Sequence, residues 1–433
     1  MRPRLLTWAF AALLITGVRI DDCGAQDFIL SGATVHTVSG ETLAPGMVRV
    51  RQGKIAQVAR EVSSDGPVID ANGLHLYPGL VAANTTLGLL EINSVRASLD
   101  TVEVGAYTPD VRSWLAVNPD SELIPVARAN GVAYFQPVPF GGLVCGQSGV
   151  MTTIGWTIEG MRFQAPVALH LDWPEMGLNL TPKEEFADKS KWKSPEDQAN
   201  ERRARLKEID DFFLEAEAYA KGRATDPDGK RLVPAWEAML PFLRGEIPLM
   251  VHADDARQIK AAVAWAEARN YKIILAGGRD AWRVAELLAE RKVPVIYDHV
   301  FTLPPRDTAP YDVQFTAPAV LHRAGVQVSF SQGGRFEATS LRNLPYAAAQ
   351  AVAFGLPADE ALKGLTLYPA GLLGVADRVG SIEAGKEATF FLADGDILDI
   401  RSQVKRMWIA GSEVSLESRH TRLYEKFRNR PKG

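Results

Sequence analysis

Hydrophobic and polar positions follow two different patterns along the chain. Residues 27–76 contain short β-type runs, such as Thr34 to Val38 and Met47 to Val50, separated by glycine and proline turns. From about Leu80 to Val375, short apolar runs alternate with helical stretches, which is typical of βα units around a parallel sheet. Beyond Gly380 the β-type pattern returns. The pattern therefore predicts a barrel-like region between two β-rich ends.

The strands and helices expected in the barrel-like region follow from these runs. Candidate strands are Val132 to Val138, Val167 to Leu171, Leu249 to Ala253, Lys272 to Leu275, Val293 to Tyr297 and Val326 to Phe330. Candidate helices are Gln198 to Ala220, Ala256 to Ala268, Trp282 to Glu290 and Tyr346 to Phe354. The helix from Gln198 is rich in charge, with Phe212, Phe213 and Leu214 as its apolar anchor, which suits an outer helix.

A glycine-rich segment, Gly141 to Gly149, follows one of the predicted strands. Its backbone N–H groups could face an anion, but the spacing fits neither a P-loop nor a dinucleotide fingerprint. We expect a flexible loop here. Cys145 lies in this segment without an evident histidine partner in sequence, which gives little support for a nucleophile.

The N-terminus has the pattern of a secretory signal. Arg2 and Arg4 precede an apolar stretch from Leu5 to Val18, and Cys23 to Ala25 supplies small residues before a cut at Gln26. The alternative is an uncleaved anchor, for which the apolar stretch is short. We expect an exported protein, periplasmic or secreted, with no membrane span after cleavage.

Composition and charge narrow the classes of partner. The 433 residues are 46% hydrophobic, enough for a large core. A net charge of −4 and a pI near 6.1, without any long basic block, give no reason to expect nucleic acid. The sequence leaves a homo-oligomer open.

Three stretches carry a resemblance to a known family. Tyr77 to Gly88 resembles the first-strand motif P-G-L-I-D-x-H-x-H, Leu249 to Ala253 resembles the fifth strand with its histidine, and Gly380 to Leu392 resembles G-x-L-x-x-G-K-x-A-D-L with Thr389 for the aspartate. Together they are similar to the amidohydrolase superfamily, in its exported imidazolonepropionase- and prolidase-related branch. The resemblance runs from about Phe28 to Tyr424.

This resemblance implies an α/β fold: a distorted TIM-like (β/α)8 barrel inserted into a small β-sandwich formed by both chain ends. The expected divisions are a signal peptide (1–25), the first half of the sandwich (26–79), the barrel (80–375), and the second half with a C-terminal tail (376–433). It also implies a site at the C-terminal ends of the strands, where a small-molecule ligand binds in the mouth of the barrel and a divalent metal such as zinc activates water.

Most positions that the resemblance assigns to metal ligands hold other side chains. They are Asn84 and Thr86 on the first strand, Ala276 on the sixth and Ser331 on the eighth. His252 on the fifth strand is kept, and His170 is the metal-competent residue in the fourth, where no lysine is evident. Neutral oxygen donors are poor substitutes for imidazoles on zinc. We therefore expect a degenerate site, with no metal retained or a divalent ion such as zinc if any.

The candidate residues keep alternative interpretations. Catalytic candidates are His252, His299 and Glu91; substrate-binding candidates are Asn84, Thr86, Ser331 and Arg335; metal candidates are His252 and His170. His252 could equally be a satisfied structural histidine and His299 a surface loop residue. Glu91 could be a salt-bridge partner, and Arg335 either a carboxylate clamp or a surface arginine.

Three functions remain open on this basis. The resemblance favours a hydrolase of non-peptide, or small peptide-like, carbon–nitrogen bonds. The missing ligands favour a catalytically inactive, metal-free binding or scaffold protein on the same fold. A metal-free enzyme using His252 or His299 with a carboxylate is the third hypothesis.

Overall fold

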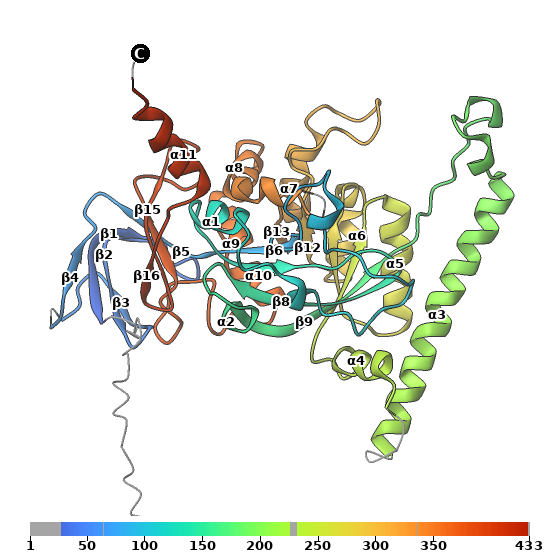
Figure 1. The fold of residues 1–433 in the computed structure, drawn as a ribbon, viewed down its shortest axis with the longest axis horizontal. Helices are drawn as coiled ribbons and strands as arrows, with labels where there is room; N and C mark the ends of the chain where they lie inside the picture. The colour runs from blue at the N-terminus through green and yellow to red at the C-terminus, as the bar shows by residue number, and fades with distance from the viewer. Residues whose placement is uncertain (1–26, 64, 226–231, 336, 432–433) are drawn as a thin grey trace, which may run out of the picture.

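The computed structural model describes residues 27–63, 65–225, 232–335 and 337–431. They form a barrel-like sheet surrounded by helices and a second sheet built from both chain ends, which we call the end sheet (Figure 1). The predicted signal peptide lies outside the described residues, so export stays a prediction. Within these ranges, no helix combines the length and hydrophobicity needed to cross a bilayer.

The barrel sheet has eight strands that hydrogen-bond in chain order. They are β6 (Leu80–Thr85), β7 (Val132–Pro137), β8 (Val144–Thr152), β9 (Arg162–Asp172), β10 (Leu249–Ala253), β11 (Ile273–Gly277), β12 (Val295–Tyr297) and β13 (Val328–Phe330). Neighbours pair in parallel except at β8, which is antiparallel to β7 and β9. The two end strands, β6 and β13, lie side by side and bring the sheet close to closure. The strands are buried along most of their length, as the continuous apolar runs indicate, apart from the first five residues of β9.

Strand β8 corrects the expectation of a flexible loop over Gly141 to Gly149. From Val144 onward the segment is a buried strand, whose glycines allow close packing, and Gly141 to Leu143 form a bend before it. A side chain at Gly146 would lie 2.7 Å from the carbonyl oxygen of Val111, and one at Gly149 would lie 2.8 Å from the Cβ of Ala165. Glycine here serves close backbone approach rather than flexibility.

Helices surround the barrel sheet. They are α1 (Leu123–Arg128), α2 (Ile158–Met161), α3 (Pro195–Thr225), α4 (Pro234–Leu243), α5 (Ala256–Ala268), α6 (Ala285–Glu290), α7 (Val313–Arg323), α8 (Leu344–Ala353), α9 (Ala358–Leu365) and α10 (Leu367–Leu372). The last helix, α11 (Arg419–Arg428), projects from the molecule on the side of the end sheet (Figure 1). Short 3-10 helices are η1 (Arg96–Ser98), η2 (Ser113–Ala116), η3 (Lys183–Glu185), η4 (Lys189–Lys191), η5 (Ala281–Val284) and η6 (Ala338–Asn343). The helix expected from Trp282 to Glu290 is therefore divided between η5 and α6.

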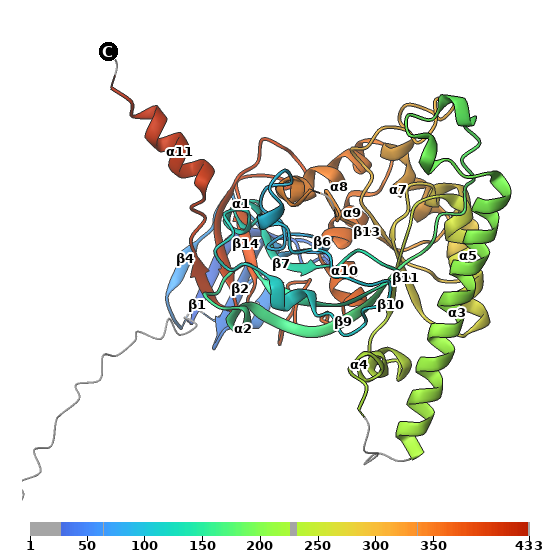
Figure 2. The ribbon, with the colours of Figure 1, turned by 45° about the vertical axis from the view of Figure 1, so that its right-hand side comes forward.

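The long helix α3 lies on the outside, at the edge far from the end sheet, as its charge predicts (Figure 2). Its buried residues are Ile209, Phe213 and Ala216. The expected anchor is only partly correct, because Leu214 is 52% exposed.

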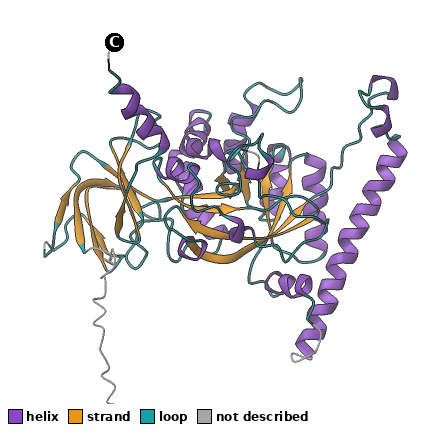
Figure 3. Ribbon diagram, viewed as in Figure 1, coloured by secondary structure: helices purple, strands orange, loops and turns teal. Residues whose placement is uncertain are grey.

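The end sheet, whose strands stand apart from the barrel in Figure 3, unites the two β-rich ends of the chain (Figure 1). Its strands are β1 (Phe28–Val35), β2 (Leu43–Arg51), β3 (Lys54–Ala59), β4 (Val68–Asp70), β5 (His75–Pro78), β14 (Phe390–Ala393), β15 (Val404–Ile409) and β16 (Ser412–Val414). The antiparallel pair β5–β14 joins the halves, and Phe28, Phe390 and Trp408 pack together in a core of their own. The predicted fold class is confirmed, with both halves in one continuous sheet.

Candidate active site

Side chains of the parallel strands point into one cavity because of strand register. His170 and Asp172 lie two residues apart on β9 and share a face. Asp172 pairs in register with His252 on β10, and His252 with Ala276 on β11. The carboxyl ends of these strands meet at a cavity of about 870 Å³, the place where barrel enzymes hold their active sites.

His252 is held from behind by a buried chain of hydrogen bonds. The Asn84 backbone N–H donates to Gln136 Oε1 (3.0 Å), so the amide group of Gln136 donates to Ser148 Oγ (2.8 Å). The Ser148 hydroxyl then donates to His170 Nε2 (2.7 Å), and His170 Nδ1–H donates to His252 Nε2 (3.0 Å). This direction leaves Nδ1 as the ring nitrogen of His252 that the network does not occupy.

Both of these histidines are neutral. Burial, reinforced by the charge of Arg335, lowers the pKa of His170 to about 3. Burial, Arg335 and His170 hold the pKa of His252 well below its ordinary value. A protonated ring would also break the network, since His252 Nε2 must accept a hydrogen bond.

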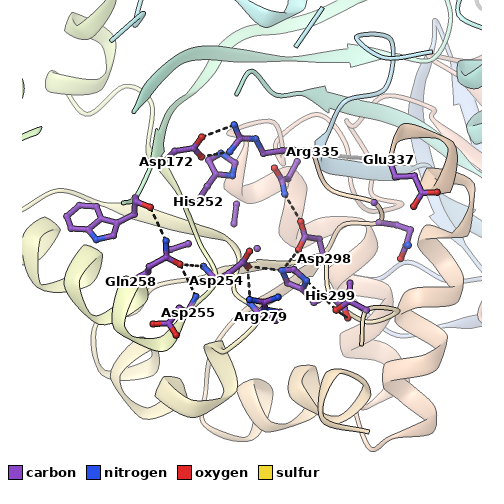
Figure 4. A pocket seen from close by; sticks show the side chains of 18 of the residues that line it. Asp172, His252, Asp254, Asp255, Gln258, Arg279, Asp298, His299, Arg335 and Glu337 are labelled. Atoms are coloured by element: carbon purple, nitrogen blue, oxygen red, sulfur yellow. Dashed lines mark hydrogen bonds and ion pairs between the residues drawn. The ribbon is translucent and has the colours of Figure 1, made fainter. Parts of the chain in front are cut away.

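Arg335 lines the cavity wall beside Asp172 and His252. It follows β13 and forms a two-pronged ion pair with Asp172, in which Nη1 contacts Oδ1 and Nη2 lies 3.0 Å from Oδ2 (Figure 4). Its guanidinium also lies 4.6 Å from the centre of the Phe140 ring. Cys145 Sγ lies 3.5 Å from Asp172 Oδ2, and burial raises the pKa of this thiol to about 12. The thiol is therefore not a nucleophile at neutral pH.

An acid–histidine cluster of Asp254, Asp298 and His299 forms the opposite wall (Figure 4). His299 Nε2 lies 2.7 Å from Asp254 Oδ1 and 3.0 Å from Asp298 Oδ1. Burial opposes the imidazolium, but the two carboxylates outweigh it and raise the pKa of His299. Burial raises the pKa of Asp298 although His299 opposes the shift. An acid of raised pKa beside an imidazolium is a pair suited to proton transfer.

The backbone is shaped around the two carboxylates. A Cβ at Gly334 would overlap Asp298 Oδ2, and one at Gly277 would lie 2.7 Å from Asp254 Oδ1. Both glycines have positive φ. The Asn84 side chain donates to Asp298 Oδ2 (3.3 Å), so the carboxylate of Asp298 is held in a tight cradle.

The structure separates the predicted site residues into two groups. Those that line the cavity are Asn84, His252, His299 and Arg335. His170 lies buried behind His252, and Ser331 donates to the Asn84 carbonyl (2.8 Å). Thr86 and Glu91 are not among the lining residues. Asn84 has φ of 54°, which breaks the strand alternation and turns Thr86 away from the site.

Sequence reasoning missed three acids of this cavity: Asp172, Asp254 and Asp298. Each comes within two residues of a strand's end. Asp172 and Asp254 also lie two residues beyond His170 and His252, so strand alternation could have found them. Asp298 directly precedes the histidine already singled out.

The residues present do not fit a divalent metal. Among the residues that the structure describes, no group of three or more His, Cys, Asp or Glu side chains is arranged to hold one. One nitrogen of His252 is occupied by His170, and Asp172 is neutralised by Arg335. Asn84 and Ala276 add only a neutral amide and a methyl group.

Comparison with known proteins gives a consistent likeness. A sequence model described as the amidohydrolase family matches residues 243–416. The amidohydrolase tasK of Hapsidospora irregularis is 22% identical over 395 residues, which are 85% of this chain and 39% of that protein. The chain thus spans about two fifths of the length of that relative.

Solved structures extend this likeness to the fold. A crystal structure of an amidohydrolase from Thermotoga maritima MSB8 has a TM-score of 0.77 and 26% identity, covering 90% of this chain and 99% of that chain. A prolidase complexed with N-methylphosphonate-L-proline has a TM-score of 0.54 and 14% identity, covering 90% of this chain and 99% of that chain. The second likeness concerns the fold alone.

Proposed function

We propose that this amidohydrolase-like chain hydrolyses a carbon–nitrogen bond of a small molecule bound in the mouth of the barrel. The bond is either a non-peptide amide, such as that of a cyclic amide, or the amide of a small peptide-like compound. One observation carries the proposal: His299 Nε2 contacts both Asp254 and Asp298 on the cavity wall. The likeness to amidohydrolases supports the reaction class.

In the proposed reaction the Asp298 carboxylate accepts a proton and the His299 imidazolium donates one. Asp298 accepts a proton from water while the water oxygen bonds to the amide carbon. His299 then donates its Nε2 proton to the nitrogen as the carbon–nitrogen bond breaks, giving a carboxylic acid and an amine. The proton held by Asp298 then passes to His299 Nε2, 3.0 Å from Asp298 Oδ1, which restores the carboxylate and the imidazolium. The raised pKa values of both groups favour these roles near neutral pH, since a base and an acid work best with pKa values near the working pH.

A metal-free binding or scaffold protein is the second candidate. It is favoured by the ion pair that engages Asp172 and by the hydrogen-bond network that engages His252 Nε2, because neither group is then free to bind a metal ion. This candidate predicts that small amides bind in the cavity without being cleaved.

The test is a screen of amide hydrolysis by the full chain. The panel contains N-acyl amino acids, cyclic amides and dipeptides, and released amine or carboxylate is measured. For any substrate cleaved, Asp298→Asn and His299→Gln should lower kcat/KM by about 100-fold or more. His322→Gln, a partly exposed histidine on α7, is the matched control and should retain activity. Binding without product would favour the second candidate, and turnover unaffected by both variants would exclude the proposed roles.

A further inference from the structure

Arg335 holds a positive charge in the part of the barrel where the resemblance implies a metal. Its ion-pair partner, Asp172, is the register neighbour of His252, the one ligand position that is kept. Asp172 and His170 share the inner face of β9. The Arg335 side chain is only 10% exposed, so this charge is built into the wall of the cavity.

An ordinary surface ion pair does not explain this arrangement. Burying a guanidinium is costly unless it is well paired, and a chain usually satisfies every buried donor. Here the Nε of Arg335 is buried without a hydrogen-bond partner. Asp172 occupies one hydrogen on each Nη, which leaves further N–H groups of the fork available. A buried cation with spare donors at a cavity wall suits a role toward a ligand oxygen.

The charge also acts on the retained histidines. Its field, after burial, is the next cause that lowers the pKa of His170 and of His252. The same field would repel a metal ion, and the Asp172 carboxylate that could bind the ion is already engaged.

We propose that Arg335 is a built-in cation that takes the place of the divalent metal. It keeps metal out by charge and by engaging Asp172, and it presents N–H donors to a carbonyl or carboxylate oxygen of the ligand. The inference goes beyond the proposed hydrolysis and does not depend on it, because metal uptake can be measured without turnover.

The test measures the zinc affinity of the full chain by titration calorimetry and its zinc content by elemental analysis after gel filtration. Wild-type protein should retain no zinc that depends on His252. Arg335→Met removes the charge and frees Asp172 beside His252, so it should bind zinc at least about tenfold more tightly than the wild type. Adding His252→Ala to Arg335→Met should abolish this gain, which locates the new site.

A charge-retaining control separates electrostatics from packing. Arg335→Lys keeps a cation and should show no gain in zinc affinity, whereas Arg335→Gln, a hydrogen-bonding replacement for use if Arg335→Met does not fold, should show the gain. About one zinc held tightly by wild-type protein and lost in His252→Ala would overturn the inference. So would unchanged zinc affinity in folded Arg335→Met or Arg335→Gln.

Discussion

His170 Nδ1 lies 3.0 Å from His252 Nε2, and the hydrogen bond between them has a defined direction. The direction follows from the Asn84 backbone N–H, which can only donate. It fixes which atoms donate at Gln136 and Ser148, and so at His170. His252, a position that the resemblance assigns to a metal ligand, thereby has one ring nitrogen engaged by a buried hydrogen-bond network while its ring still lines the cavity. The pair has consequences for stability that do not require any knowledge of the substrate.

We expect stability to fall as the pH drops below about 6.5. The pKa of His170 is about 3 in the folded protein, and that of His252 is also lowered, so the unfolded chain binds more protons than the folded chain in acid. Their contribution is present above pH 6.5 and is lost as the pH falls, by about 1.4 kcal/mol per pH unit for each histidine. Urea midpoints measured from pH 7.5 to 4.5 would show this slope.

The variant His170→Gln tests the assignment. It should be less stable at pH 7.5, because packing is lost, but its stability should decline less steeply toward pH 4.5. His322→Gln, in which the replaced histidine is partly exposed, should keep the wild-type slope. Identical slopes for all three proteins would show that the buried pair does not control the acid response.

The Ser148 hydroxyl should contribute more to the free energy of unfolding than the hydroxyl of Ser329, which is also buried. Ser148 links Gln136 to His170, whereas Ser329 Oγ is buried with no hydrogen-bond partner. Ser148→Ala leaves two buried groups unpaired and should cost about 1 to 3 kcal/mol of unfolding free energy. Ser329→Ala should be neutral or slightly stabilising. Chemical denaturation of both variants measures these changes. Equal losses of unfolding free energy in the two variants would contradict the proposed network.

Much of the barrel could be predicted from the sequence because buried strands leave strong local signals. Leu249 to Ala253 and Ala256 to Ala268 occur with the predicted bounds, since apolar runs and helical spacing mark them. Strand β8 was missed because glycine usually indicates turns, and the close contacts that require Gly146 and Gly149 come from distant segments.

The site was less predictable because its chemistry depends on contacts between strands. His252 and His299 could be singled out as residues, but the partners that decide their roles are distant in sequence. Asp172 meets Arg335 across 163 positions, and Asn84 meets Asp298 across 214. No local pattern encodes such pairs, and the left-handed backbone of Asn84, which turns Thr86 away, is also invisible to strand alternation.

Gly334 should be required for the position of the Asp298 carboxylate. A methyl group there would overlap Asp298 Oδ2, whereas one at Gly73 would meet nothing within 4 Å. Both glycines have positive φ, so alanine adds similar backbone strain of about 1 kcal/mol at each. Gly334→Ala should therefore lower hydrolysis at least about tenfold, and Gly73→Ala should leave it unchanged. Similar activity in the two variants would separate Asp298 from the reaction.

The pH dependence of hydrolysis should reveal which carboxylate supports His299. In the proposed reaction His299 must be protonated, so activity is lost as the pH rises through its pKa, which Asp298 and Asp254 raise above the ordinary value. Asp254→Asn removes one of these charges and the hydrogen-bonding carboxylate, so the alkaline limb of kcat/KM should move to lower pH by about one unit. Asp255→Asn is the matched control: it alters the next carboxylate along the chain, whose partner is Arg257, and asparagine also caps a helix well. Its alkaline limb should stay in place. If both variants kept the wild-type limb, a group other than His299 would donate the proton, and the acid–histidine cluster would serve binding alone.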